Sequence, residues 1–223
     1  MNVLGWIEDL AAPLEAIGVD APPAPRWNQD WFPRLDAAAA YAIVRQTAPR
    51  RIVEVGSGHS TRFLARAVVD GELDTQITSI DPAPRATLAG LPIRRFETRV
   101  ENADMRLFQA LAPGDILFID SSHQVKPGSD VEFLLKAVLP LLPAGVHVHF
   151  HDIFIPDGYP PQWEWRRYNE QAAVAALIES NVFTVEFASH ALVSRSPEKI
   201  RGVLSRLPLL PGAIESSLWL TRH

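Results

Sequence analysis

The chain has 223 residues, of which 47% are hydrophobic and 21% are charged, and its formal net charge at pH 7 is −5. This length suits one domain with a sizeable core, and the negative charge argues against a nucleic-acid-binding surface. The absence of cysteine excludes disulfides, thiolate metal sites and thiol nucleophiles. There is no uninterrupted apolar stretch of the roughly 18 residues that a membrane span needs, and Glu8 and Asp9 are unlike a secretory signal. We therefore expect a soluble, cytoplasmic protein whose single domain covers residues 1–223.

The first part of the chain, residues 1–50, is predicted to be helical and extended. Apolar side chains recur there at helical spacing and predict one amphipathic helix: Leu4, Ile7, Leu10, Leu14 and Ile17. Residues 18–34 are rich in proline and contain Trp27 and Trp31, which predicts an ordered extended connection. A second helix is expected over 36–46.

From residue 51 onward, strand-like and helix-like segments alternate. Strands are expected near 51–55, 77–81, 94–99, 115–120 and 146–151. Helices are expected over 61–70, 104–111 and 130–142, the last of which opens with a capping box formed by Ser129 and Glu132. Such alternation predicts right-handed crossovers and a parallel sheet.

The end of the chain departs from this alternation. A proline- and aromatic-rich loop covers 154–165, after which a helix at 168–180 leads to a strand at 182–188. Ser196 as N-cap and Pro197 at the first helical position predict another helix. The last residues have the alternating pattern of a terminal strand.

The most informative stretch is 51–61, where a β-branched run breaks into a turn that contains Gly56 and Gly58. Glycine allows the backbone to approach a ligand, and the following helix offers unpaired N–H groups to it. Glu54 precedes the first glycine by two positions, and Asp81 ends the next predicted strand. A carboxylate at that strand end usually holds the ribose hydroxyls of a nucleoside. These features predict a nucleoside-cofactor site on an open α/β sheet.

These motifs resemble those of class I S-adenosylmethionine-dependent methyltransferases. The segment Glu54-Val-Gly56-Ser-Gly58-His-Ser60 resembles the first family motif, Asp/Glu-x-Gly-x-Gly-x-Gly, with serine at the third glycine. Asp81 resembles the acidic residue that holds the cofactor's ribose. Residues 115–123 resemble the fourth-strand motif, and residues 145–154 resemble the fifth strand and its exit loop. The closest characterised relatives that this resemblance implies are small-molecule O-methyltransferases.

The resemblance implies an α/β fold with a Rossmann-like, doubly wound, seven-stranded sheet, mostly parallel with an antiparallel C-terminal strand. That strand is expected at 216–221, with Leu218 and Leu220 on one face and Trp219 on the other. Residues 51–223 would form the core, and residues 1–50 would cover the acceptor pocket. The implied function is S-adenosylmethionine-dependent methylation of a small molecule at oxygen, without a nucleic-acid or membrane partner.

The cofactor-binding residues implied by the resemblance are Glu54, Gly56, Ser57, Gly58, Ser60, Asp81 and Asp104. Glu54 is expected to face the ammonium group of the methionine moiety, directly or through water. Asp104 resembles the position that meets the adenine edge, although a carboxylate favoured by a helix dipole explains it equally well.

Two alternatives stay open. An NAD(P)-dependent oxidoreductase also uses a glycine turn and a later acid. However, Glu54 would repel a pyrophosphate and attract an ammonium group, and Ser60 and Thr61 replace the small residue expected for close helix packing. The second alternative is a non-catalytic cofactor-binding protein with the methyltransferase fold.

Acidic and histidine side chains gather at the ends of the fourth and fifth predicted strands, and these are the predicted catalytic residues: Asp120, His123, His151 and Asp152. In doubly wound sheets, these strand ends flank the ligand crevice. His147, His149 and His151 alternate along one strand and therefore share one face. We expect a structural role for His147, whereas a neutral His151 would take the acceptor's proton.

A divalent metal is compatible with this pattern but is not favoured. In metal-dependent catechol-type relatives, two acids at the places of Asp120 and Asp152 hold the cation, and hard oxygen ligands suit Mg²⁺ or Ca²⁺. Those relatives usually supply a further Asp or Asn where this chain has Ile153. The ligand set is therefore incomplete unless His123, His151 or an acceptor oxygen completes it.

Aromatic and basic side chains follow the fifth predicted strand: Trp163, Trp165, Arg166, Arg167 and Tyr168. Because loops at the strand ends form the acceptor pocket in such sheets, we expect one of these aromatic side chains to form a pocket wall.

Overall fold

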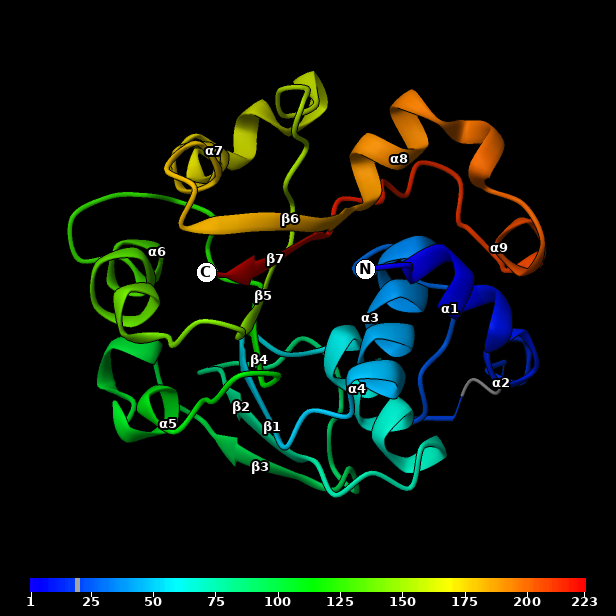
Figure 1. Cartoon of the computed structure of the whole chain (residues 1–223), viewed down its shortest axis with the longest axis horizontal. Coiled ribbons are helices and arrows are strands. Elements are labelled where there is room, and N and C mark those ends of the chain that lie inside the picture. The colour runs from blue at the N-terminus through cyan, green and yellow to red at the C-terminus, as the bar shows by residue number, and fades with distance from the viewer. Residues whose placement is uncertain (19–20) are drawn as a thin grey trace.

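The computed structural model describes residues 1–18 and 21–223. Its centre is a seven-stranded sheet in the order β3-β2-β1-β4-β5-β7-β6 (Figure 1). The strands are β1 (Arg51–Val55), β2 (Gln76–Ile80), β3 (Ile93–Phe96), β4 (Ile116–Ile119), β5 (His147–Phe150), β6 (Phe183–Ala188) and β7 (Leu218–Arg222). Strands β1 to β5 run parallel, and β7 lies antiparallel between β5 and β6. The predicted fold class is confirmed.

The terminal strand has the predicted place and orientation. In β7, Leu220 lies opposite Val148 of β5 and Val185 of β6. Leu218 and Leu220 pack into one hydrophobic core and Trp219 into the other, because consecutive strand residues point to opposite faces. An all-parallel sheet would have favoured the dinucleotide-binding alternative, so the antiparallel strand argues against it.

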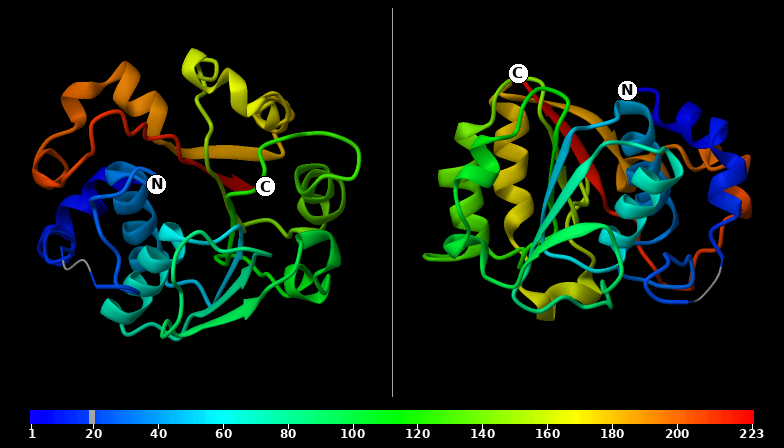
Figure 2. Two further views of the ribbon diagram at one scale, coloured as in Figure 1. Left: turned by 180° about the vertical axis from the view of Figure 1, so that it is seen from behind. Right: turned by 90° about the horizontal axis from the view of Figure 1, so that it is seen from below.

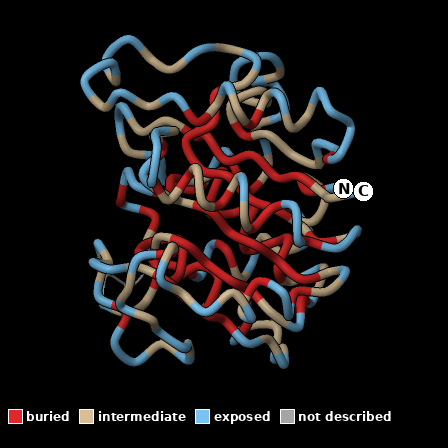
Figure 3. The backbone as a smooth tube through the Cα atoms, turned by 90° about the vertical axis from the view of Figure 1, so that its left-hand side faces the viewer, coloured by how far each residue is buried: buried red, intermediate tan, exposed pale blue. Residues whose placement is uncertain are grey.

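Helices cover both faces of the sheet (Figures 1 and 2). They are α1 (Val3–Asp9), α2 (Ala11–Glu15), α3 (Arg34–Thr47), α4 (His59–Asp70), α5 (Arg106–Gln109), α6 (Asp130–Phe133), α7 (Glu170–Glu179), α8 (Ser189–Arg195) and α9 (Val203–Arg206). Helices α1, α3, α4 and α9 pack on one face, and α5, α6 and α7 pack on the other. Figure 3 shows the buried segments of the chain gathered in the middle of the molecule. No helix in the described part of the chain is long and apolar enough to cross a membrane.

Several predicted helices are interrupted. The N-terminal helix breaks at Leu10, which caps both α1 and α2. The helix predicted over 130–142 begins as α6, widens into a π-helix and ends as a 3₁₀ turn containing Pro140. The helix predicted after Ser196 is only a 3₁₀ turn, and Gly202 in the left-handed region separates it from α9. Helix α8 was not predicted.

Candidate active site

The glycine turn brings the ends of β1 and β4 into contact. Gly56 has φ +80°, and a Cβ atom there would lie 1.9 Å from the carbonyl oxygen of Asp120. The backbone N–H of Asp120 donates to the carbonyl oxygen of Val55 at 2.8 Å. Glycine is therefore required at residue 56 by both the backbone conformation and the close approach. The predicted cofactor turn and the predicted catalytic Asp120 form one structural unit.

Glu54 lies beneath this turn and is fully buried. Ser60 Oγ and Thr61 Oγ1 each donate to its carboxylate at 2.7 Å. Thr61 Oγ1 also accepts from the backbone N–H of Gly58, so this contact links β1 to the turn and to the first turn of α4. The side chains of Glu54 and Ser60 thus stabilise the turn from within the protein. A contact between Glu54 and the ammonium group of the cofactor stays a prediction.

The charge state of Glu54 is expected to make stability depend on pH. Burial raises the pKa of its carboxyl from 4.5 to about 8. Between these pH values the folded state holds a proton that the unfolded state has released, so stability falls as pH rises through this window. We expect Glu54→Gln, which imitates the protonated acid, to raise the Tm relative to the wild type more at pH 9 than at pH 6. An equal difference in Tm at both pH values would contradict this assignment.

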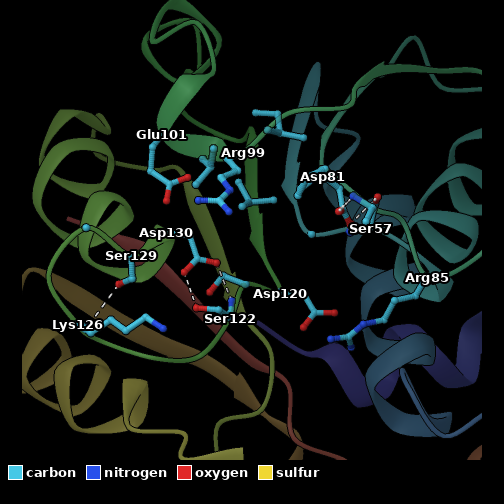
Figure 4. A pocket seen from close by; sticks show the side chains of 18 residues that line it. Ser57, Asp81, Arg85, Arg99, Glu101, Asp120, Ser122, Lys126, Ser129 and Asp130 are labelled. Carbon is cyan, nitrogen blue, oxygen red and sulfur yellow. Dashed lines mark hydrogen bonds between the residues drawn. The ribbon is translucent and has the colours of Figure 1, made fainter.

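A cavity of about 430 Å³ opens beside the turn at the carboxyl ends of β1, β2 and β4 (Figure 4). Asp81 lies at its wall, where one carboxylate oxygen accepts from the backbone N–H of Ser57 at 2.7 Å and from Ser57 Oγ at 3.1 Å. The other oxygen accepts from the N–H of Ala83 at 2.7 Å. The structure therefore places Gly56, Ser57 and Asp81 at the cavity.

Asp104 lies outside this cavity. Its exposed carboxylate pairs with the Arg106 guanidinium, and this contact lowers the pKa of Asp104. Glu101, in the 3₁₀ turn Val100–Asn102, lines the cavity instead. Among the described residues, its buried Oε2 has no hydrogen-bond partner. Sequence reasoning missed Glu101, because a turn residue after a strand has no periodic signal.

The four predicted catalytic side chains converge. His123 Nε2 lies 3.3 Å from Asp120 Oδ1 and 3.5 Å from Asp152 Oδ2. His151 Nδ1 lies 3.5 Å from Oδ1 of Asp120 and of Asp152. His123 and Asp152 have φ values of 58° and 56°, and non-glycine residues in this region store backbone strain of the kind found at functional sites.

Two further carboxylates, which sequence reasoning missed, support the histidines from behind. Glu170, at the start of α7, lies 3.0 Å from His123 Nδ1. Asp36, in the first turn of α3, lies 3.3 Å from His151 Nε2 and also accepts from the backbone N–H groups of Ser216 and Ser217. Both carboxylates are buried. They fix the orientation of the two imidazole rings.

The carboxylates determine the charge of the cluster. Burial alone would lower the pKa of His151, but the charges of Asp152 and Asp120 raise it well above its ordinary value. The pKa of His123 is likewise raised, despite its burial, by Asp120 and Glu170. The two imidazoles in turn hold the pKa of Asp120 well below its usual range, against the opposing effect of burial. The raised pKa favours the imidazolium form of His151 over the neutral ring expected from the sequence, and the role of His151 stays a prediction.

The other two histidines of β5, His149 and His147, contact residues of the sheet and lie outside the cluster of predicted catalytic residues. Burial lowers the pKa of His149 well below its ordinary value. Its Nε2 lies 2.9 Å from Ser217 Oγ, and its ring stacks on Phe118. His147 Nδ1 lies 3.0 Å from Thr221 Oγ1.

The residues at the predicted metal site do not fit a hard divalent cation. Asp120 and Asp152 supply carboxylate oxygens, but the imidazoles of His123 and His151 already approach those oxygens. Ile153, in the place of the further acid, is buried in the hydrophobic core. Within residues 1–18 and 21–223, no group of three or more histidine and acidic side chains has metal-binding geometry.

A narrow cleft of about 60 Å³ lies above the cluster. Its lining includes Asp120, His151 and Asp152 together with Trp31, Arg85, Trp163 and Arg166. Trp163 is thus the aromatic side chain of the 154–168 region that forms a wall. Trp165 is 76% exposed, and Tyr168 packs on the His123 ring. Asp120 and Arg85 line both this cleft and the larger cavity, and Figure 4 shows Arg85 extending toward Asp120.

Comparison with known proteins agrees with this architecture. Residues 53–153 match the family model of a methyltransferase domain. The SAH-bound methyltransferase PaMTH1 of Podospora anserina is 18% identical, with a TM-score of 0.54, over 100% of this chain and 88% of that one. The O-methyltransferase from Bacillus cereus in complex with SAH is 13% identical, with a TM-score of 0.50, over 100% and 91% of the two chains. No curated protein matches the chain. At these identities the two structures show the shared fold.

Proposed function

We propose that the chain is a class I S-adenosylmethionine-dependent methyltransferase and that it transfers the methyl group to an oxygen of a small-molecule acceptor. The match of residues 53–153 to a methyltransferase-domain model and the shared methyltransferase fold support this proposal. One observation carries this proposal. The cavity beside the glycine turn and the cleft above the histidine cluster share Asp120 and Arg85. A cofactor in the cavity and an acceptor in the cleft would therefore meet at Asp120.

The proposed chemistry needs mainly positioning. S-adenosylmethionine supplies an activated methyl group, so the protein must align the acceptor oxygen with it. The acceptor hydroxyl must also lose its proton. The charged His123 and His151 would stabilise the resulting oxyanion and so lower the pKa of the acceptor hydroxyl, whose proton would leave to water. Asp120, whose own pKa is held low, would accept a hydrogen bond from the hydroxyl and orient it. Asp36 and Glu170 would act as positioning residues, since each holds one imidazole.

Cofactor binding tests the first half of this proposal. We expect S-adenosylmethionine and S-adenosylhomocysteine to bind at micromolar affinity and NAD not to bind. Asp81→Ala should weaken S-adenosylhomocysteine binding by about 2 kcal/mol, roughly 30-fold, because a charge-assisted hydrogen bond is lost. Calorimetry measures both effects.

Asp104→Ala is the matched control, because Asp104 lies outside the cavity and should leave the affinity within about twofold of the wild type. If Asp81→Ala binds as tightly as the wild type, the ribose is placed wrongly. If NAD binds and S-adenosylmethionine does not, the proposed function fails.

A further inference from the structure

Two tryptophan–arginine pairs form walls of the cleft above the histidine cluster. The guanidinium of Arg85 lies over the Trp31 ring at 4.7 Å, and that of Arg166 lies over the Trp163 ring at 4.1 Å. Trp31 comes from the segment before α3, whereas Trp163 and Arg166 come from the 3₁₀ turn Pro161–Arg166 after β5. Trp31 is 48% exposed, although it lies over a binding cleft. The walls thus present flat aromatic surface and positive charge together.

Neither of these two arginines has an acidic partner. Among the described residues, no carboxylate lies within 4.0 Å of either guanidinium, whereas Arg34 and Arg195 each pair with one. Within the described part of the chain, the Arg166 side chain donates a single hydrogen bond, from Nη1 to the hydroxyl of Tyr168 at 3.2 Å. Its Nε is buried and has no partner among the described residues. A planar carboxylate is the group that matches a guanidinium edge of this kind.

The floor of the cleft has the opposite character. Asp120 and Asp152 lie there with His151 between them, and Asp30 also lines the cleft. These three carboxylates outnumber the imidazoles beside them, so a carboxylate group is less favoured here than beside the arginines, whereas a hydroxyl group can hydrogen-bond to the floor. A ligand with both groups would therefore point its hydroxyl at the floor and its anionic end at the arginines.

We propose that this cleft binds a single-ring aromatic acceptor that carries both a carboxylate and a hydroxyl group. The carboxylate pairs with Arg166 and Arg85, the ring lies against Trp31 and Trp163, and the hydroxyl reaches Asp120. The volume of about 60 Å³ is smaller than the roughly 150 Å³ of a cavity that encloses benzene, so the cleft would take only part of one ring and disfavours larger acceptors. The assignment of this ligand as the methyl acceptor rests on the proposed function, but its binding does not.

The test measures binding of hydroxybenzoates and of their matched carboxamides by calorimetry, with and without S-adenosylhomocysteine. We expect at least one hydroxybenzoate to bind at least tenfold more tightly than its amide, because the amide lacks the charge that the guanidinium recognises. Arg166→Gln should remove this preference, and Arg166→Lys should keep part of it. Arg167→Gln is the matched control, since that neighbouring side chain is exposed and does not line the cleft. Thermal unfolding verifies that each variant is folded.

Equal binding of acids and amides, or no binding of any hydroxybenzoate, would overturn the inference. Tighter binding of hydroxybenzylamines would also overturn it, because the acidic floor would then govern recognition. A hydroxybenzoate that binds through Arg166 but is not methylated supports the inference and contradicts the proposed oxygen methylation. If a hydroxybenzoate binds to this protein but S-adenosylhomocysteine does not, the further inference is supported and the proposed methyl transfer is contradicted.

Discussion

Gly56→Ala is expected to lower the free energy of unfolding by about 3 kcal/mol or more and to abolish S-adenosylhomocysteine binding. The added Cβ would lie 1.9 Å from the carbonyl oxygen of Asp120, a backbone atom that cannot turn away. The φ of +80° adds strain for any residue with a Cβ. Relief requires the ends of β1 and β4 to separate, which deforms the cavity wall that Gly56 and Asp120 share. Thermal unfolding should show a Tm lower by roughly 6–12 °C.

Gly158→Ala serves as the control for the loss of a glycine. Gly158 lies in the loop after β5, and a Cβ atom there meets nothing within 4 Å. The Tm of the Gly158→Ala variant and its affinity for S-adenosylhomocysteine should match those of the wild type within error. A Gly56→Ala variant with wild-type stability and affinity would show that β1 and β4 need not lie this close.

Sequence reasoning predicted the sheet well because its signals are local. The strand β1 is a short β-branched run between polar residues, and the alternation Leu218-Trp219-Leu220 assigned each side chain to the correct face. Helix continuity was harder to predict, because it depends on tertiary contacts. At Gly202, for example, the carboxylate of Glu8 binds the backbone N–H of Val203 and anchors the start of α9. No periodic pattern around residue 202 indicates this contact.

The same distinction applies to the site. Asp120 and Asp152 could be placed together because adjacent parallel strands end at the same edge of the sheet. Asp36 and Glu170 were missed because each has the sequence context of an ordinary acid in the first turn of a helix. The raised pKa of His151 depends on how close the carboxylates of Asp152 and Asp120 lie to its ring. The sequence places these groups at neighbouring strand ends but gives no distances between them.

The charged state of His151 changes the expected pH dependence of methyl transfer. A neutral imidazole base would make kcat/KM rise as pH increases through the ordinary pKa near 6.5. In the proposed mechanism the protonated ring is the active form, and the raised pKa favours that form at neutral pH. Activity should therefore show no rise attributable to His151 near pH 6.5 and should decline as pH rises through the raised value. A pH–rate profile of the wild type, compared with that of the His151→Ala variant, separates the two cases.

His151→Ala should lower kcat by roughly 10²-fold or more once an acceptor is identified, while cofactor affinity stays nearly unchanged. The imidazolium supplies donors and positive charge where the acceptor oxygen becomes negative, and loss of one such donor costs an enzyme about this much. His147→Ala is the matched control, because His147 lies on the same strand face but bonds Thr221 away from the cleft. EDTA should have little effect, because buried Ile153 stands where metal-dependent relatives supply a further acid and the imidazoles already approach the oxygens of Asp120 and Asp152. If EDTA abolishes activity, Mg²⁺ restores it and His151→Ala remains active, a metal ion activates the acceptor and the role assigned to His151 is wrong.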